Sequence, residues 1–248
     1  MKGCGLASAV RTLTIFPFPG QESESPATTF YWFVPIGAFL GGLLYTVALL
    51  CQPLGAPLLS GALIIGLLAY FTRAFHLDGL CDMVDGFGGG WTKERKLEIM
   101  KDSHVGAFGV IALIITLFLK VAAVALLVER GGLITLVYVP LFSRFLVVAQ
   151  AVCNPYARKE GGTAGRSVIE GRLRHVLVAL GWVVGAFFFA PLVTVAAMAG
   201  VGVVVTLAIA WHARKQVGGV TGDILGATVE LSETAMLVVG AILTPLLF

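Results

Sequence analysis

The sequence has 248 residues, of which 58% are hydrophobic and only 12% are charged. Soluble globular proteins carry roughly 25% charged residues, and a chain this apolar could not cover a water-facing surface without large apolar patches. The composition therefore excludes a soluble enzyme and a disordered regulator, and it predicts a membrane protein in contact with lipids. The net charge of +3 is small, and no basic tract is interleaved with aromatic residues, so nucleic acid is excluded as a partner.

Seven apolar segments of the chain are candidates for membrane crossings. A helix rises about 1.5 Å per residue, so about 20 residues cross a hydrocarbon core of roughly 30 Å. The candidates are residues 30–51, 52–72, 105–128 and 131–157, two segments within 175–212 that are separated at Pro191, and a last one over 223–248. The second segment is expected to run on into the polar stretch 73–85. We therefore predict an all-α fold, a polytopic integral membrane bundle of about seven transmembrane helices.

The basic residues assign a side of the membrane to each connecting segment. Seven crossings place 14 of the 17 lysine and arginine residues on one side, and such a bias marks the cytoplasm. The N-terminus is therefore expected in the cytoplasm and the C-terminus outside. We predict a multi-pass protein of the cell inner membrane, with a single transmembrane catalytic domain over residues 1–248. Its site is expected on the cytoplasmic face, formed by loops 73–104, 153–175 and 211–233.

Three aspartates at the cytoplasmic end of the second segment are the most informative residues. Asp78, Asp82 and Asp85 are spaced i, i+4 and i+7, which puts three carboxylates on one face of a helix. Like charges about 6 Å apart repel by roughly 3 kcal/mol per pair at an effective dielectric constant of about 20. A hard divalent cation bound by oxygen atoms offsets such repulsion and bridges to substrate phosphates. The pattern favours a Mg²⁺ site over three solvated loop acids.

A short helix over residues 93–103 is predicted after a run of glycines, with Thr92 as its N-cap. Lys101 and Asp102 lie at its end. Asp102 is a candidate for a fourth carboxylate on the metal, and Lys101 is a candidate phosphate contact. An amphipathic interfacial helix with ordinary surface charges is the alternative interpretation.

A second acidic cluster precedes the last apolar segment. Asp223 and Glu230 are spaced i, i+7 on one helix face, and Thr221 can cap that helix so that its free N–H groups point at an anion. We predict that these three residues bind substrate. The alternative is a glycine-rich connecting loop whose acids have no role.

Two arginines supply the opposite charge. Arg144 lies within the fourth apolar segment, where a guanidinium is costly, and Arg158 follows that segment. A guanidinium binds phosphate through two hydrogen bonds, so both are candidate phosphate contacts. For Arg158, contact with anionic lipid is the alternative. Lys120, also within a span, is expected to face the bundle or to snorkel rather than to touch a ligand.

These residues carry a resemblance that covers nearly the whole chain. The motifs are HLDGLxDxxDG at 76–86, EIMKDSxxGxxG at 98–109, SR at 143–144, PYAR at 155–158 and GxTGDxLGAxxE at 219–230. In this order the arrangement resembles the adenosylcobinamide-GDP ribazoletransferases, also called cobalamin synthases. The resemblance implies that adenosylcobinamide-GDP and α-ribazole, or its 5′-phosphate, are converted to adenosylcobalamin or its 5′-phosphate with release of GMP, in a reaction that depends on Mg²⁺.

The resemblance and the residue chemistry together define a predicted site. A Mg²⁺ ion held by Asp78, Asp82 and Asp85, with Asp102, would bind the diphosphate, while Arg144 and Arg158 hold phosphate oxygens. His76 or one of the aspartates would accept the proton of the ribose hydroxyl that attacks phosphorus, and the sequence leaves this choice open. A homo-oligomer is left open as well.

Two other functions remain alternatives at this stage. A CDP-alcohol phosphotransferase also has several aspartates and releases a nucleoside monophosphate, but its D-G-x-x-A-R pattern lacks a counterpart here, because Leu80, Cys81, Asp82 and Met83 follow Gly79. A cation transporter would carry acids at mid-depth in its spans, whereas these acids cluster at one face.

Overall fold

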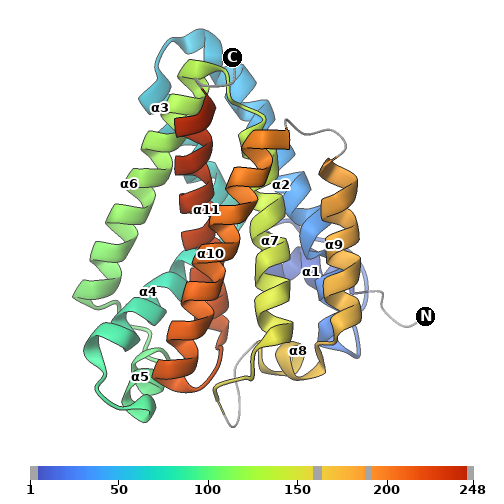
Figure 1. Ribbon diagram of the computed structural model, residues 1–248, viewed down its shortest axis with the longest axis vertical. Coiled ribbons are helices and arrows are strands. Elements are labelled where there is room, and N and C mark those ends of the chain that lie inside the picture. The colour runs from blue at the N-terminus through green and yellow to red at the C-terminus, as the bar shows by residue number, and fades with distance from the viewer. Residues whose placement is uncertain (1–4, 159–163, 188–191, 245–248) are drawn as a thin grey trace.

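The structure of the protein, a computed structural model, describes residues 5–158, 164–187 and 192–244. In these ranges the chain is helical and forms an elongated bundle (Figure 1). The α-helices are α1 (Leu6–Leu13), α2 (Phe30–Cys51), α3 (Pro57–Phe71), α4 (Phe75–Gly89), α5 (Lys93–Ile99), α6 (Ala107–Arg130), α7 (Thr135–Cys153), α8 (Gly165–Glu170), α9 (Leu173–Phe187), α10 (Leu192–Val217) and α11 (Gly222–Leu243). Two 3₁₀ helices, Pro26–Thr29 and Gln52–Leu54, flank α2. The predicted all-α membrane bundle is confirmed.

Five of the described helical stretches are long and apolar enough to cross a membrane. They are Pro26–Leu54, α6, α7, Val193–Val217 within α10, and α11. The α3 and α4 helices together would make a sixth, but they are bent by 89° at the break between them, and α9 is an apolar helix of only 15 residues. Each of the seven predicted segments thus contains a helix, while the number of crossings and the side of the N-terminus stay predictions. The predicted separation at Pro191 lies outside the described residues.

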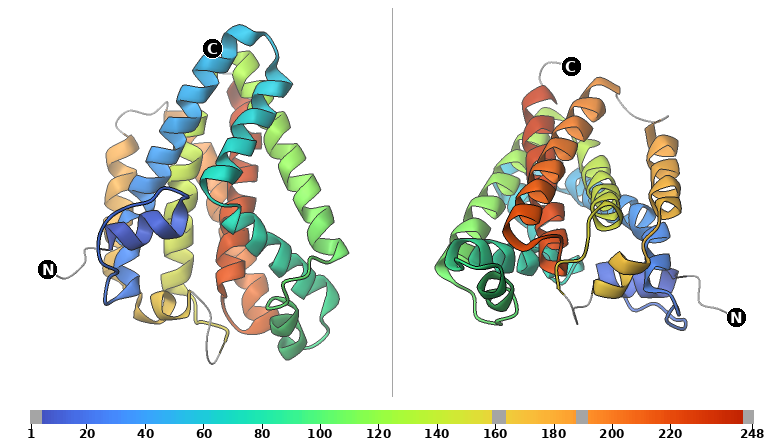
Figure 2. Two further views of the ribbon diagram at one scale, coloured as in Figure 1. Left: turned by 180° about the vertical axis from the view of Figure 1, so that it is seen from behind. Right: turned by 60° about the horizontal axis from the view of Figure 1, so that its bottom comes forward.

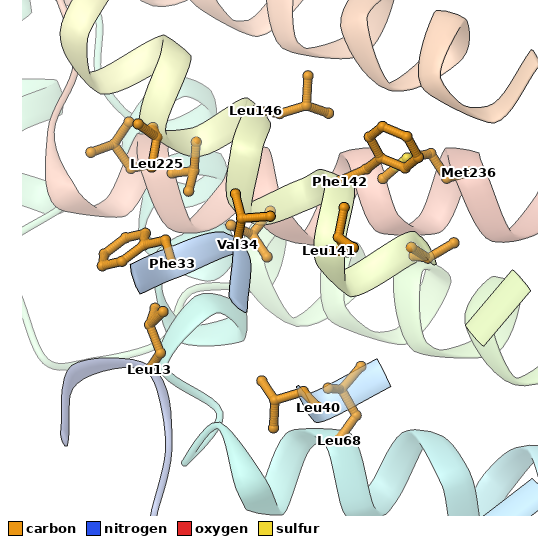
Figure 3. Packing of buried hydrophobic residues seen from close by; sticks show 14 of the residues in the cluster. Leu13, Phe33, Val34, Leu40, Leu68, Leu141, Phe142, Leu146, Leu225 and Met236 are labelled. Atoms are coloured by element: carbon orange, nitrogen blue, oxygen red, sulfur yellow. The ribbon is translucent and has the colours of Figure 1, made fainter. Parts of the chain in front are cut away.

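The α7 and α11 helices form the centre of the bundle. Most of their residues are buried, whereas only 28% of the apolar window is buried in α6 and in α10, as expected for helices that face lipid. A Cβ added to Gly37 of α2 would lie 3.1 Å from the Cα of Leu141 in α7. Small residues at a crossing let helices pack this closely in a membrane. Phe33, Val34 and Phe142 belong to the same buried cluster (Figure 3).

The chain turns sharply between α3 and α4. Arg73 and Ala74 both adopt the left-handed backbone conformation, with φ of 54° and 52°, and this ends α3 before the polar stretch begins. The expectation that the second apolar segment continues as one helix into residues 73–85 is therefore wrong. Beyond the turn, α4 packs on α11 and α6 (Figure 2).

Each of the three stretches predicted as loops contains helical residues. Residues 73–104 contain α4 and α5, residues 153–175 contain α8, and residues 211–233 hold the end of α10 and the start of α11. The predicted N-cap of α5 is confirmed, because Thr92 Oγ1 accepts a hydrogen bond from the N–H of Arg95 at 3.2 Å. These stretches lie at one end of the bundle, where α4 packs against α11 and α5 (Figure 1).

Candidate functional site

The α4 helix crosses the start of α11 at two glycines. A Cβ added to Gly79 would lie 3.1 Å from the Cα of Asp223, and one added to Gly226 would lie 3.4 Å from the Cα of Gly79. The two backbones are in contact here, which only glycine permits at so short a distance. This crossing brings Asp78 and Asp82 of α4 to the side of Asp223.

We call Asp78, Asp82 and Asp223 the acidic cluster. Asp78 is exposed, Asp82 is half-buried, and the side chain of Asp223 is 21% exposed. The negative charges of Asp78 and Asp223 both act on Asp82, and the charge of Asp78 acts on Asp223. Carboxylates crowded in this way destabilise one another unless a cation is bound near them.

Arg158 reaches the acidic cluster because two connecting segments are joined by backbone hydrogen bonds. The N–H of Ala157 donates to the carbonyl of Val220 at 2.9 Å, and the N–H of Val220 donates to the carbonyl of Pro155 at 2.9 Å. This isolated parallel bridge holds Arg158 next to the start of α11. Arg158 Nη2 then donates to Asp223 Oδ2 at 2.8 Å.

Thr221 has the position predicted for it. Its hydroxyl accepts a hydrogen bond from the N–H of Ile224 at 3.3 Å as the N-cap of α11, and donates to Asp223 Oδ2 at 3.2 Å. The structure thus brings together Arg158, Thr221 and Asp223, which sequence reasoning assigned to two separate segments. The burial of Tyr156 beside them raises the pKa of its phenol.

Asp85 was predicted to bind the metal, but in the structure its carboxylate binds backbone N–H groups at the start of α6. It is 7% exposed, and its two carboxylate oxygens accept hydrogen bonds from the N–H groups of Gly106 at 2.7 Å and Gly109 at 2.8 Å. These are among the N–H groups at the start of α6 that have no partner within the helix. Asp85 therefore caps α6 and neutralises the positive end of its dipole.

Asp85→Asn is expected to lower the free energy of unfolding by about 1–3 kcal/mol, because one of the two N–H groups would then face an amide NH₂ group instead of a carboxylate oxygen. Thermal unfolding in detergent measures the effect. Asp78→Asn is the matched control, since Asp78 is exposed on the same helix. Equal unfolding midpoints for Asp85→Asn and the wild type would contradict the capping role.

Lys101 and Asp102 have no hydrogen bond to the acidic cluster among the described residues. Both are exposed, and Asp102 Oδ1 is 2.6 Å from Nδ1 of His104. This hydrogen bond holds the pKa of Asp102 below its usual value. Among the residues that the structure describes, no three His, Cys, Asp or Glu side chains converge as ligands for one metal ion. The predicted set of four carboxylates is therefore not assembled around one point.

Arg144 and Glu230, both predicted to bind substrate, lie in a buried network of charges. Arg144 donates to Glu233, and Lys120 Nζ donates to Glu230 Oε2 at 2.6 Å and to Glu233 Oε2 at 2.7 Å. Ser143 Oγ donates to Glu233 Oε1 at 2.9 Å. The four charged side chains are at most 7% exposed and pair with one another, so they join α6, α7 and α11 inside the bundle. We call them, with Ser143, the buried ion network.

Sequence reasoning missed Glu233 as the centre of this network. A signal was present, because Lys120 and Arg144 are the two basic residues inside predicted spans and need two buried acids. Glu230 and Glu233, spaced i, i+3 in the last helix, are the pair that balances them.

His76 lies between the buried ion network and a cavity. It is 4% exposed, and its Nδ1 has no hydrogen-bond partner among the described residues. The charges of Arg144 and Glu233 act on it from one side, and on the other it lines a cavity of about 430 Å³. A buried imidazole nitrogen without a partner can accept a hydrogen bond from a ligand hydroxyl.

The sequence matches the family model described as cobalamin-5-phosphate synthase over residues 5–241. The chain belongs to this family. Three relatives, each called adenosylcobinamide-GDP ribazoletransferase, are similar to it over nearly their whole length. The protein of Chlorobium phaeovibrioides is 40% identical over 232 residues, which cover 92% of this chain and 93% of the relative. The protein of Chlorobium phaeobacteroides is 38% identical over 245 residues, which cover 96% of this chain and 98% of the relative. The protein of Syntrophobacter fumaroxidans is 39% identical over 246 residues, which cover 94% of this chain and 95% of the relative. No solved structure matches the chain.

Membership of the cobalamin-5-phosphate synthase family decides between the activities considered from the sequence. It makes the chain a membrane transferase of the final stage of cobalamin biosynthesis. The CDP-alcohol phosphotransferase and the cation transporter are set aside. Of the predicted site residues, the structure gathers Asp78, Asp82, Thr221, Asp223 and Arg158 at the α4–α11 crossing.

Proposed function

We propose that this cobalamin-5-phosphate synthase carries out the ribazoletransferase reaction at the acidic cluster. It transfers the adenosylcobinamide phosphate group from adenosylcobinamide-GDP to α-ribazole or its 5′-phosphate and releases GMP. The observation that carries the assignment is the meeting of Asp78 and Asp82 with the Arg158–Asp223 ion pair, since carboxylates next to a guanidinium suit a diphosphate and its counterion.

The donor chemistry of the acidic cluster fits Mg²⁺. This ion is usually held by one or two carboxylates together with waters and substrate phosphates, so a three-ligand protein site is not required. Asp78 and Asp82 are one helical turn apart, accessible to different degrees, and are the residues that would hold it. When bound, the ion would neutralise negative charge that develops on the leaving phosphate.

The chain's own residues bind phosphate and move one proton in the proposed reaction. Arg158 Nε is buried and has no hydrogen-bond partner among the described residues, so it is available to a phosphate oxygen. The ribose hydroxyl oxygen of the acceptor bonds to the phosphorus that carries adenosylcobinamide. The bond from that phosphorus to the GMP oxygen breaks, and GMP leaves with the electron pair. We assign the hydroxyl proton to His76, because its Nδ1 is a buried acceptor on α4 without a partner among the described residues and borders the cavity.

We propose that the site faces the cytoplasm from the inner membrane. Support comes from the sequence, in which most basic residues fall on the side that also carries the acidic cluster. Five described helical stretches have the length and composition of spans. An interfacial position lets large polar substrates reach the carboxylates without entering lipid.

Purified protein in detergent, given adenosylcobinamide-GDP, α-ribazole 5′-phosphate and Mg²⁺, is expected to release GMP and to form a corrinoid that carries the lower ligand. An excess of EDTA should stop GMP release, and added Mg²⁺ should restore it, because the crowded carboxylates and the diphosphate then lack their counterion. Chromatography of GMP provides the measurement. No GMP with the complete mixture would refute the function, and undiminished release in EDTA would refute only the metal.

A further inference from the structure

The cavity beside His76 is separate from the carboxylates of the acidic cluster but shares a wall with them. Its volume is about 430 Å³, and it is lined by residues of α1, the segment after it, α7, α8, and the starts of α2, α4 and α11. His76, Gly222 and Gly226 line it, whereas Asp78 and Asp82 do not. Figure 2 shows α1 lying beside α2, away from α5. The cavity therefore borders the α4–α11 crossing at residues other than the carboxylates of the acidic cluster.

The size of the cavity and its apolar wall suit one of the two substrates. Pockets for small ligands have volumes of roughly 300–1,000 Å³, and a corrin ring that carries adenosyl and GDP groups is too large for a space near the lower limit. Phe30, Phe33 and Phe75 line the cavity. Aromatic side chains stack on flat rings or meet them edge to face, so this wall fits a benzimidazole-type base.

The cavity lining also includes polar residues, among them two arginines. Arg11 donates to the carbonyl of Gly20 at 2.7 Å, and Arg73 donates to the carbonyl of Arg11. A guanidinium has five N–H donors, so both retain donors for a ligand. Glu22 also lines the cavity, and its single negative charge leaves the two arginines with a net positive charge. Arg73 also holds a left-handed backbone conformation that is unfavourable for a residue with a side chain, and such strain is often found at binding sites.

We propose that this cavity binds the acceptor, α-ribazole 5′-phosphate, with its base against the phenylalanines and its phosphate at Arg11 and Arg73. This inference rests on the proposed function. In this arrangement the ribose lies between the two ends of the ligand, and the unpartnered His76 is the buried polar group that faces it. The two substrates then approach the α4–α11 crossing from different sides, the acceptor through the cavity and the diphosphate at the acidic cluster.

Two variants test the cavity in the full-length protein in detergent. Ser167→Trp on α8 should fill the cavity, which Ser167 lines. Its matched control is Ile169→Trp, because Ile169 is on the same short helix, is 65% exposed and does not line the cavity. Arg11→Gln should remove one phosphate contact, and its control is Arg174→Gln, an exposed arginine outside the cavity. Thermal unfolding is to establish that each variant remains folded.

Calorimetric titration with α-ribazole 5′-phosphate and with α-ribazole, together with KM values under turnover, gives the readout. We expect Ser167→Trp to raise Kd and KM for both acceptors by more than tenfold. Arg11→Gln should raise those for the phosphorylated acceptor by about tenfold and leave those for α-ribazole unchanged, as the loss of one charge-assisted hydrogen bond predicts. The KM for adenosylcobinamide-GDP should stay constant, and both controls should behave as the wild type.

The outcomes separate the cavity from the function. If the wild type releases GMP and both cavity variants keep wild-type Kd and KM values for the acceptors, the cavity assignment is wrong and the proposed function stands. A rise in KM for adenosylcobinamide-GDP alone would likewise overturn it. If the wild type releases no GMP, the proposed function fails, and the titrations with the two acceptors still decide what the cavity binds.

Discussion

Asp82→Asn is expected to reduce GMP release by about a thousandfold while the protein stays folded. Asp82 is half-buried in α4 and borders both other carboxylates of the acidic cluster. Loss of its charge would remove several kcal/mol of stabilisation from a metal-bound diphosphate, and each 1.4 kcal/mol is about a factor of ten in rate. Folding should not suffer, because the substitution removes a charge that its neighbours repel.

The assay of GMP release under saturating Mg²⁺ tests this expectation. Glu98→Gln is a suitable control, since Glu98 is an exposed acid on the neighbouring α5 that pairs with Arg95 at 2.7 Å. Thermal unfolding of both variants should match the wild type. An Asp82→Asn protein with near-normal turnover would refute the acidic cluster as the metal site, whatever its stability.

Glu233→Gln is expected to destabilise the protein by about 3–5 kcal/mol. Glu233 accepts hydrogen bonds from Lys120, Arg144 and Ser143, and all of these side chains are buried. Without its charge, two buried cations share the single carboxylate of Glu230. An unpaired charge inside a protein is far more costly than the loss of a surface ion pair.

The free energy of unfolding, measured by titration with a denaturing detergent, gives the size of this destabilisation. The matched single control is Glu129→Gln, because Glu129 is an exposed acid at the end of α6. The double variant Lys120→Met and Glu230→Gln removes one cation and one acid together and should cost less than Glu233→Gln alone, since Arg144 and Glu233 stay paired. Equal stability of Glu233→Gln and the wild type would contradict the buried ion network.

Local patterns in the sequence predicted the helices and several of their ends correctly. The apolar segments became helices, Thr92 and Thr221 cap the helices that follow them, and Asp78, Asp82 and Asp85 share one helix as their spacing indicated. These features depend on residues within about two turns of each other, so a single sequence contains the information.

Contacts between distant segments were not predicted. The break between α3 and α4 uses positive φ at Arg73 and Ala74, two residues that give no local sign of such a conformation. Asp85 looked like its neighbours Asp78 and Asp82, and only the position of α6 shows that it caps that helix. Arg144 was assigned to phosphate for a sound reason, namely the cost of its burial, but its partner lies 89 positions away in the chain.

The buried ion network has a consequence for how the protein is made. Lys120 precedes Glu230 by 110 positions and Glu233 by 113, so α6 and α7 emerge from the ribosome with their cations well before the balancing acids exist. A chain is synthesised from its N-terminus, and a lone cation in hydrocarbon is unfavourable. We therefore expect α6 and α7 to stay at the insertion machinery, or near the lipid headgroups, until the last helix is inserted and completes the bundle.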